Sequence, residues 1–157
     1  MLSQEETQII KDAVNDFFAR AGQDGEIKSF SLKQEGENEI LDINIRSNDA
    51  QMLIGKQGMV LSDIQLLLRK IIKKKLDREI FLNLDIDNYK KKKEDYLRDL
   101  AEEAANEVLT TKKEKELLLP SPFDRRIVHL ELARRDNLIV ESIGEGEERR
   151  IIIKPKE

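Results

Sequence analysis

Two glycines enclose a lysine and a glutamine in the stretch Gly55-Lys56-Gln57-Gly58, which interrupts an otherwise helical pattern. Glycine frees the φ angle and lets the backbone approach another molecule closely. A loop that opens a helix also presents N–H groups and the positive end of the helix dipole, which suits phosphate. Lys56 adds a cation, and Gln57 adds a neutral hydrogen-bonding group. The same spacing also occurs in plain turns, so the surrounding residues must decide between a turn and a phosphate site.

Charge is distributed unevenly around this loop. The net charge of the chain is −4, yet residues 1–54 hold 5 Lys/Arg against 11 Asp/Glu (net −6), and residues 55–78 hold 7 against 2 (net +5). Arg69 and Lys73, four residues apart, share one side of the expected helix. A local basic field matters more than the total charge for binding a polyanion. The alternative is that the lysines form only a solvated helix end, where cations also suit the dipole.

A second pair of candidate residues, Arg125 and His129, occurs in the segment PSPFDRRIVHLEL. At positions i and i+4 of a helix these two residues lie on one face. We expect that face to be exposed, and we expect Phe123, Ile127 and Leu130 to pack inward.

Several classes of function lack support in the sequence. The chain has no cysteine and one histidine, so a zinc site would need carboxylates for most of its ligands. Neither G-x-S-x-G nor G-x-x-x-x-G-K-S/T occurs, and the carboxylates are scattered along polar faces. We therefore expect no enzyme, no catalytic residue, no metal and no cofactor. The N-terminus lacks a signal-peptide pattern, and no apolar run approaches the ~18 residues of a membrane span, which predicts a cytoplasmic protein.

The elements that position the loop follow from the pattern of apolar residues. Helical spacing near the N-terminus is followed by alternating apolar residues over 27–46, which predict a hairpin. A short helix and a longer helix flank the glycine loop, and perfect alternation over 80–86 predicts a third strand. The order is α-β-β-α-α-β, so we expect a first domain over residues 1–87.

A second domain is expected over residues 88–157, in the order α-β-α-β-β. Lysines 90–93 wrap the first turn of its long helix, where cations oppose the dipole, and we expect them to be solvated. Ser121, Pro122 and Asp124 specify the start of its second helix. The fold class is therefore α+β, with a three-stranded sheet in each unit.

The first unit resembles a KH domain of the bacterial type II order, in which a GXXG loop clamps about four nucleotides of single-stranded backbone. Arg125 and His129 resemble the R-x-x-x-H signature of the R-three-H domain, a small α/β unit associated with single-stranded nucleic acids. The pieces NYKKKKEDYL, RRIVHLEL and ESIGEGEERRIIIKP look like the bacterial Jag family (SpoIIIJ-associated proteins), in which the two domains occur in tandem. Jag proteins commonly have a separate N-terminal domain, which we expect this chain to lack.

The resemblance implies a non-catalytic protein that binds single-stranded RNA and acts as a bacterial post-transcriptional regulator. The loop would hold phosphates, Ile54 and the second strand would line a base groove, and Arg125 and His129 would add a second contact surface. Single-stranded DNA is an alternative ligand, and a KH-domain partner or a homodimer is a further expectation. The candidate binding residues are Ile54, Gly55, Lys56, Gln57, Gly58, Arg69, Lys73, Arg125, His129, Arg149 and Arg150.

The competing interpretation is a protein-interaction adaptor that uses the KH fold as a scaffold, for example one associated with a membrane insertase or cell-envelope machinery. Its acidic first helix and hairpin would then bind a protein partner. Fold alone does not fix function. An adaptor has no need for two glycines around Lys56, so the loop favours the RNA-binding interpretation.

Overall fold

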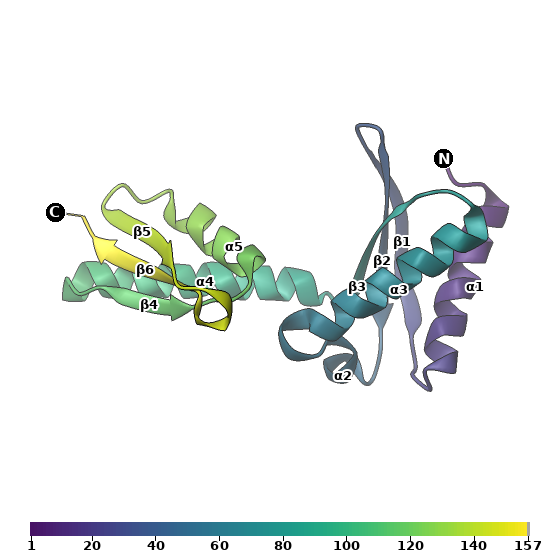
Figure 1. Ribbon diagram of the computed structural model, residues 1–157, viewed down its shortest axis with the longest axis horizontal. Helices are drawn as coiled ribbons and strands as arrows, with labels where there is room; N and C mark the ends of the chain where they lie inside the picture. The colour runs from purple at the N-terminus through teal and green to yellow at the C-terminus, as the bar shows by residue number, and fades with distance from the viewer. Residues whose placement is uncertain (157) are drawn as a thin grey trace. The chain divides into compact units, whose positions relative to one another are not determined.

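The computed structural model describes residues 1–156 of the chain. The fold is α+β, as predicted, with two compact units, Met1–Lys90 and Lys91–Glu157, that each contain a three-stranded sheet (Figure 1). Both predicted element orders are confirmed, because the first unit runs α-β-β-α-α-β and the second runs α-β-α-β-β.

The first unit places a short helix, the glycine loop and a long helix between its second and third strands. Its elements are α1 (Gln4–Arg20), β1 (Glu26–Glu35), β2 (Asn38–Arg46), α2 (Ala50–Ile54), the 3-10 turn η1 (Lys56–Gly58), α3 (Met59–Leu76) and β3 (Phe81–Ile86). β2 is the central strand, antiparallel to β1 and parallel to β3.

The core of the first unit lies between the sheet and two helices. Strand alternation directs Leu41, Ile43 and Ile45 of β2 to one face, where all three are buried. α1 and α3 pack against each other and cover this face (Figure 1). The core is aliphatic with one fully buried aromatic side chain, Phe18 of α1. Such close packing fixes α3, and with it the loop that opens α3.

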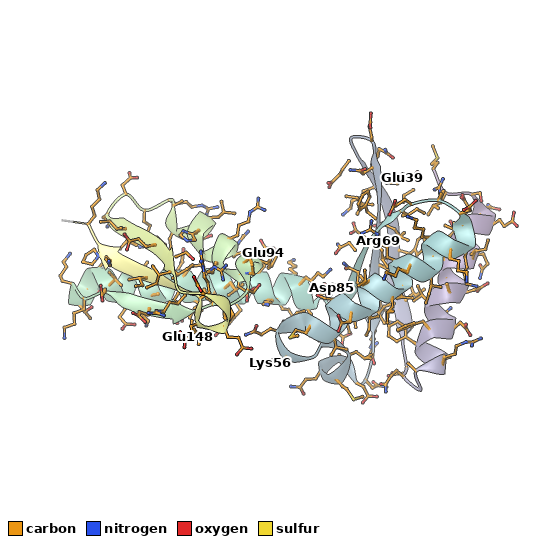
Figure 2. The ribbon with its side chains drawn as sticks, in the orientation of Figure 1. Glu39, Lys56, Arg69, Asp85, Glu94 and Glu148 are labelled. Atoms are coloured by element: carbon orange, nitrogen blue, oxygen red, sulfur yellow. The ribbon has the colours of Figure 1, made fainter. Side chains whose placement is uncertain are left out.

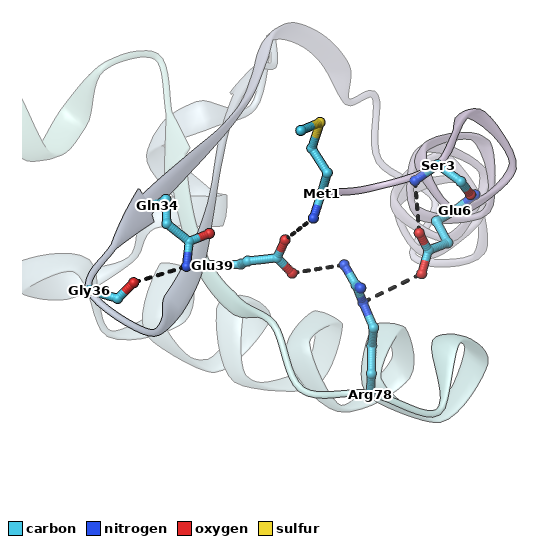
Figure 3. A network of polar contacts seen from close by, with 7 residues as sticks. All are labelled: Met1, Ser3, Glu6, Gln34, Gly36, Glu39 and Arg78. Carbon is cyan, nitrogen blue, oxygen red and sulfur yellow. Dashed lines mark hydrogen bonds and ion pairs between the residues drawn. The ribbon is translucent and has the colours of Figure 1, made fainter.

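A polar network around Arg78 ties the connection between α3 and β3 to the rest of the first unit (Figure 3). The Arg78 guanidinium lies 2.8 Å from a Glu39 carboxylate oxygen on β2 and 3.4 Å from Glu6 of α1. Glu6 also accepts a hydrogen bond from the Ser3 N–H, which completes a capping box at the start of α1. The amino group of Met1 contacts Glu39 at 2.6 Å. One arginine therefore holds the hairpin and the first helix together.

The second unit packs two helices against an antiparallel sheet of order β4-β6-β5. Its elements are α4 (Tyr89–Thr111), β4 (Lys115–Leu118), α5 (Pro122–Leu132), β5 (Leu138–Ile143), the 3-10 turn η2 (Gly146–Glu148) and β6 (Arg150–Pro155). Alanines 101, 104 and 105 of α4 are fully or almost fully buried, so the helix can approach its neighbours closely. The Ser121 hydroxyl accepts a hydrogen bond from the Asp124 N–H, as the predicted helix start requires.

The lysine run at the start of α4 is not simply solvated, and that expectation was wrong for two of its residues. The Lys90 ammonium donates to Gln65 Oε1 at 3.0 Å and to Asn83 Oδ1 at 2.6 Å. Burial lowers the pKa of Lys90, although nearby aspartates act in the opposite direction. Lys93 forms an ion pair with Asp124 at 3.0 Å. Both lysines therefore face anionic or polar groups that offset their unfavourable position at the positive end of the helix dipole.

Candidate nucleic-acid interface

The backbone of the GKQG loop adopts angles that favour glycine. Three of its four residues have positive φ: Gly55 at 71°, Gln57 at 54° and Gly58 at 78°. Gly55 combines this φ with a ψ of −177°, a region in which essentially only glycine occurs. The Gly58 N–H donates to the Gly55 carbonyl at 3.2 Å, so the loop closes on itself before α3 begins.

The space around both glycines is also tight, most of all at Gly55. A Cβ on Gly55 would lie 2.4 Å from Val60 Cγ2, and a Cβ on Gly58 would lie 2.9 Å from Tyr89 Cε1. The loop therefore packs back against the first turn of α3 and against the residue that opens α4. This close packing on the inner side holds the outer side of the loop in one shape.

The outer side of the loop presents a cation flanked by apolar surface. The side chains of Lys56 and Gln57 are exposed, and Figure 2 shows Lys56 projecting from the loop. Among residues 1–156, Lys56 takes part in no ion pair. Met52 of α2 and Met59 of α3 expose more than half of their surface on either side of the loop. The arrangement can attract a phosphate and, beside it, accommodate a base.

Ile54 and the strand β2, which the KH resemblance implies for a base groove, are largely taken up by the core. Ile54 is partly buried against the core, and the inward side chains of β2 are fully part of that core. The open edge of the sheet beside α3 belongs to β3. There Gln65 Oε1 accepts a hydrogen bond from the Leu84 N–H at 2.9 Å. Met52 and Met59, which the sequence reasoning missed, add exposed apolar surface next to the loop, and the part of Ile54 and the second strand in a base groove stays a prediction.

Arg69 and Lys73 lie away from the loop, further along α3. At 1.5 Å per residue, Arg69 is about 16 Å from Gly58 along the helix axis. Both cations pair with Glu79, at 3.2 Å and 3.3 Å, and together they hold the pKa of that carboxyl below its usual range. The Arg69 guanidinium also stacks 4.9 Å from the centroid of the Phe81 ring. The two cations therefore form a cluster of their own further along α3, and their part in nucleic-acid binding stays a prediction.

Arg125 and His129 share one face of α5, but neither is fully exposed. The Arg125 guanidinium donates to the carbonyl oxygens of Leu119 (2.8 Å) and Pro120 (2.6 Å), so it braces the segment that precedes the helix. Burial, and then the charge of Arg125, lower the pKa of His129. The imidazole is therefore neutral at pH 7 and can hydrogen-bond or stack without carrying charge.

The expected inward packing of α5 was wrong for two of its three apolar residues. Ile127 is buried, but Phe123 is 54% exposed and Leu130 is 61% exposed. The inner face is instead completed by Val128, Leu132 and the carboxylate of Asp124. Only one side of this short helix is covered by the rest of the unit, so apolar residues outside that side remain in solvent.

Arg149 and Arg150 lie where η2 leads into β6, and both contact the protein. The Arg149 guanidinium donates to Ser142 Oγ at 3.3 Å and to the Gly144 carbonyl at 3.0 Å. Arg150 pairs with Glu116 of β4 at 3.1 Å. Their partners orient the two side chains and neutralise part of the charge of Arg150.

Two further observations concern the part of the chain that the structure describes. None of the helices within residues 1–156 is both long and apolar enough to cross a bilayer. The same residues contain no group of three or more His, Cys, Asp or Glu side chains arranged to hold a metal ion.

Known families match both units. A family model of the KH domain matches residues 10–93, and one of the R-three-H domain matches residues 95–155. Three similar proteins carry the name RNA-binding protein KhpB. The protein from Clostridium symbiosum is 33% identical over 116 residues, which cover 74% of this chain and 52% of the relative. The protein from Bacillus subtilis (strain 168) is 31% identical over 115 residues, 72% of this chain and 55% of the relative.

The third relative, from Lactiplantibacillus plantarum, is 29% identical over 117 residues, which cover 74% of this chain and 36% of the relative. The chain thus spans about half the length of the first two relatives and about a third of the third.

Proposed function

The chain belongs to the KH-domain family and carries an R-three-H domain behind its KH unit, and from this premise we propose that it is a non-catalytic protein that binds single-stranded RNA. The tandem order is the one expected from the resemblance to the Jag family. The proposal assigns residues 1–87 and 88–157 as two nucleic-acid-binding domains of a cytoplasmic bacterial regulator.

The observation that carries the proposal is the geometry of the GKQG loop. Gly55 and Gly58 are held in conformations that an ordinary side chain would strain, and the exposed Lys56 stands between them. A backbone without side chains can approach a phosphate closely, and the start of α3 adds the positive end of a helix dipole. A plain turn would not need these features together with an exposed cation.

The remaining candidate residues would contribute in two ways, by direct contacts with RNA and by long-range attraction. Arg125, anchored by two carbonyl oxygens, would offer its remaining N–H groups to a phosphate, and the neutral His129 would hydrogen-bond or stack. The other basic candidates would add to the field that attracts RNA: Arg69, Lys73, Arg149 and Arg150.

The test is fluorescence anisotropy of the whole chain with a labelled single-stranded RNA of mixed sequence, at several salt concentrations. We expect binding at micromolar protein, with log K falling linearly against log salt by about 0.7 per phosphate contact. A single-stranded DNA of the same sequence and the duplex form serve as comparison ligands, and the duplex should bind more weakly. A folded protein that binds none of these at low salt would refute the proposal and favour the adaptor interpretation.

A further inference from the structure

Helix α5 separates its charges between two faces. The carboxylates of Asp124 and Glu131 turn inward, with side chains only 6% and 13% exposed. Asp124 pairs with Lys93 of α4 at 3.0 Å, and Glu131 lies 4.0 Å from the guanidinium of Arg98, also on α4. Both carboxylates therefore face α4, and Glu131 also lies 3.5 Å from the guanidinium of Arg134, just beyond the end of α5.

The outer face of the same helix carries only cations and apolar groups. Phe123 and Leu130 are exposed, Arg126 is exposed, and the Arg134 side chain just beyond the helix end is 74% exposed. Steps of three or four residues separate Phe123, Arg126 and Leu130, so these three follow one another along a single side of the helix over about 10 Å. Arg134 comes four residues later, just beyond the helix end. We name Phe123, Arg126, Leu130 and Arg134 the α5 stripe.

We propose that the α5 stripe is a second RNA-contact surface of the protein, on which a base stacks against Phe123 and Leu130 contacts its neighbour while Arg126 and Arg134 bind phosphates. This inference rests on the proposed RNA-binding function. It assigns base contacts to residues other than Arg125 and His129, which border the stripe. Arg125 already donates hydrogen bonds to two carbonyl oxygens, and His129 is neutral at pH 7. The stripe therefore supplies the exposed positive charge of this helix.

Single-stranded RNA fits the stripe because one nucleotide combines a flat apolar ring with a negative charge. A duplex would bury its bases and offer only phosphates. Aromatic side chains beside cations form the general platform for single strands, and stacking tolerates every base. A purely apolar partner would give Arg126 no counter-charge. Arg134 pairs with Glu131 at 3.5 Å, but its side chain is 74% exposed, and such a pair contributes only about 0–1 kcal/mol, so a phosphate can replace the carboxylate at little cost. The inward position of Asp124 and Glu131 limits repulsion toward phosphates.

The test compares the RNA affinity of the whole chain with that of stripe variants. Phe123→Ala should reduce affinity about 5- to 150-fold, the range measured for one base stacked on one aromatic ring. It should leave the salt slope unchanged. Arg126→Ala with Arg134→Ala should instead lower the magnitude of the salt slope by about 1.4, because two phosphate contacts are lost.

Matched control variants distinguish a loss of base stacking from a loss of apolar packing. Leu118→Ala removes a side chain of β4 that is as exposed as Leu130, and it should leave affinity unchanged. Phe123→Leu keeps an apolar group but removes the aromatic ring, so a loss of affinity at an unchanged melting temperature identifies stacking. Should Phe123→Ala lower the melting temperature, its loss of affinity could come from lost stability, and the RNA affinity of Phe123→Leu then decides whether the ring stacks on a base.

The outcomes distinguish this inference from the proposed function. A parent protein that binds RNA while both Phe123 variants and the double arginine variant bind equally well overturns the α5 stripe but leaves RNA binding intact. The stripe would then be left as a protein-contact surface. A parent protein that binds no RNA overturns both.

Discussion

Replacing Lys56 and Gln57 by Asp tests the loop while keeping both glycines. The backbone should tolerate the change, because Gln57 has φ 54° and ψ 24°, a left-handed conformation in which Asp is enriched. Lys56 is exposed and enters no ion pair within the described residues 1–156. We therefore expect the melting temperature of the double variant to stay close to that of the parent.

The effect on binding follows from the charges that face the phosphates. Two unit charges about 4 Å apart in water interact by about 1 kcal/mol. The double variant exchanges one attraction, from Lys56, for two repulsions, so it should lose about 3 kcal/mol, or about 150-fold in affinity at low salt. Loss of one phosphate contact should also reduce the magnitude of the salt slope by about 0.7.

The assay is anisotropy with labelled single-stranded RNA over a series of salt concentrations, beside circular dichroism melting curves. The same dipeptide, Lys33-Gln34, occurs in β1, so Lys33→Asp with Gln34→Asp makes an identical change of charge elsewhere. Lys33 pairs with Asp42 at 2.6 Å, so this control should lose some stability but retain most of its affinity. A folded loop variant that binds as tightly as the parent would refute the assignment of the loop.

Two further predictions concern the glycines and the histidine. Gly55→Ala should lower the free energy of unfolding by about 1–3 kcal/mol from backbone strain alone, and more from the clash with a valine 2.4 Å away, in denaturant titrations. Gly22→Ala is its control, since Gly22 also has a positive φ (69°) but no atom within 4 Å, and an equal loss in both would contradict the packing argument. The lowered pKa of His129 means that the unfolded chain binds its proton first as the pH falls below about 6.5, so stability should be complete above that pH and decline below it. Because His129 is the only histidine, His129→Gln should remove this decline between pH 7.5 and 5.5, and an unchanged decline in the variant would show that another group causes it.

The strands and the loop could be predicted because their signals are local. The alternation of apolar residues over 80–86 matches the two-residue period of a strand. The two glycines of the loop mark positions at which the φ angle is free. The burial of Asp124 could not be predicted in this way, because its partner Lys93 is 31 positions away in the sequence. The exposure of Phe123 also escaped prediction, since residue type indicates burial only where a neighbouring element covers that side of the helix.

Local ion pairs also change what the basic segment contributes to binding. Of the seven cations in residues 55–78, Arg69 and Lys73 pair with Glu79, and Arg78 pairs with Glu6 and Glu39. The first two pairs are partly exposed, and such pairs contribute only about 0–1 kcal/mol, so RNA phosphates could replace Glu79 at little cost. Arg78 instead joins two elements across the unit, and its loss to a phosphate would release both carboxylates. The number of phosphate contacts should therefore be smaller than the number of basic residues. Much of the affinity for RNA that the net charge of +5 suggests must then come from close approach of the loop backbone to the phosphates.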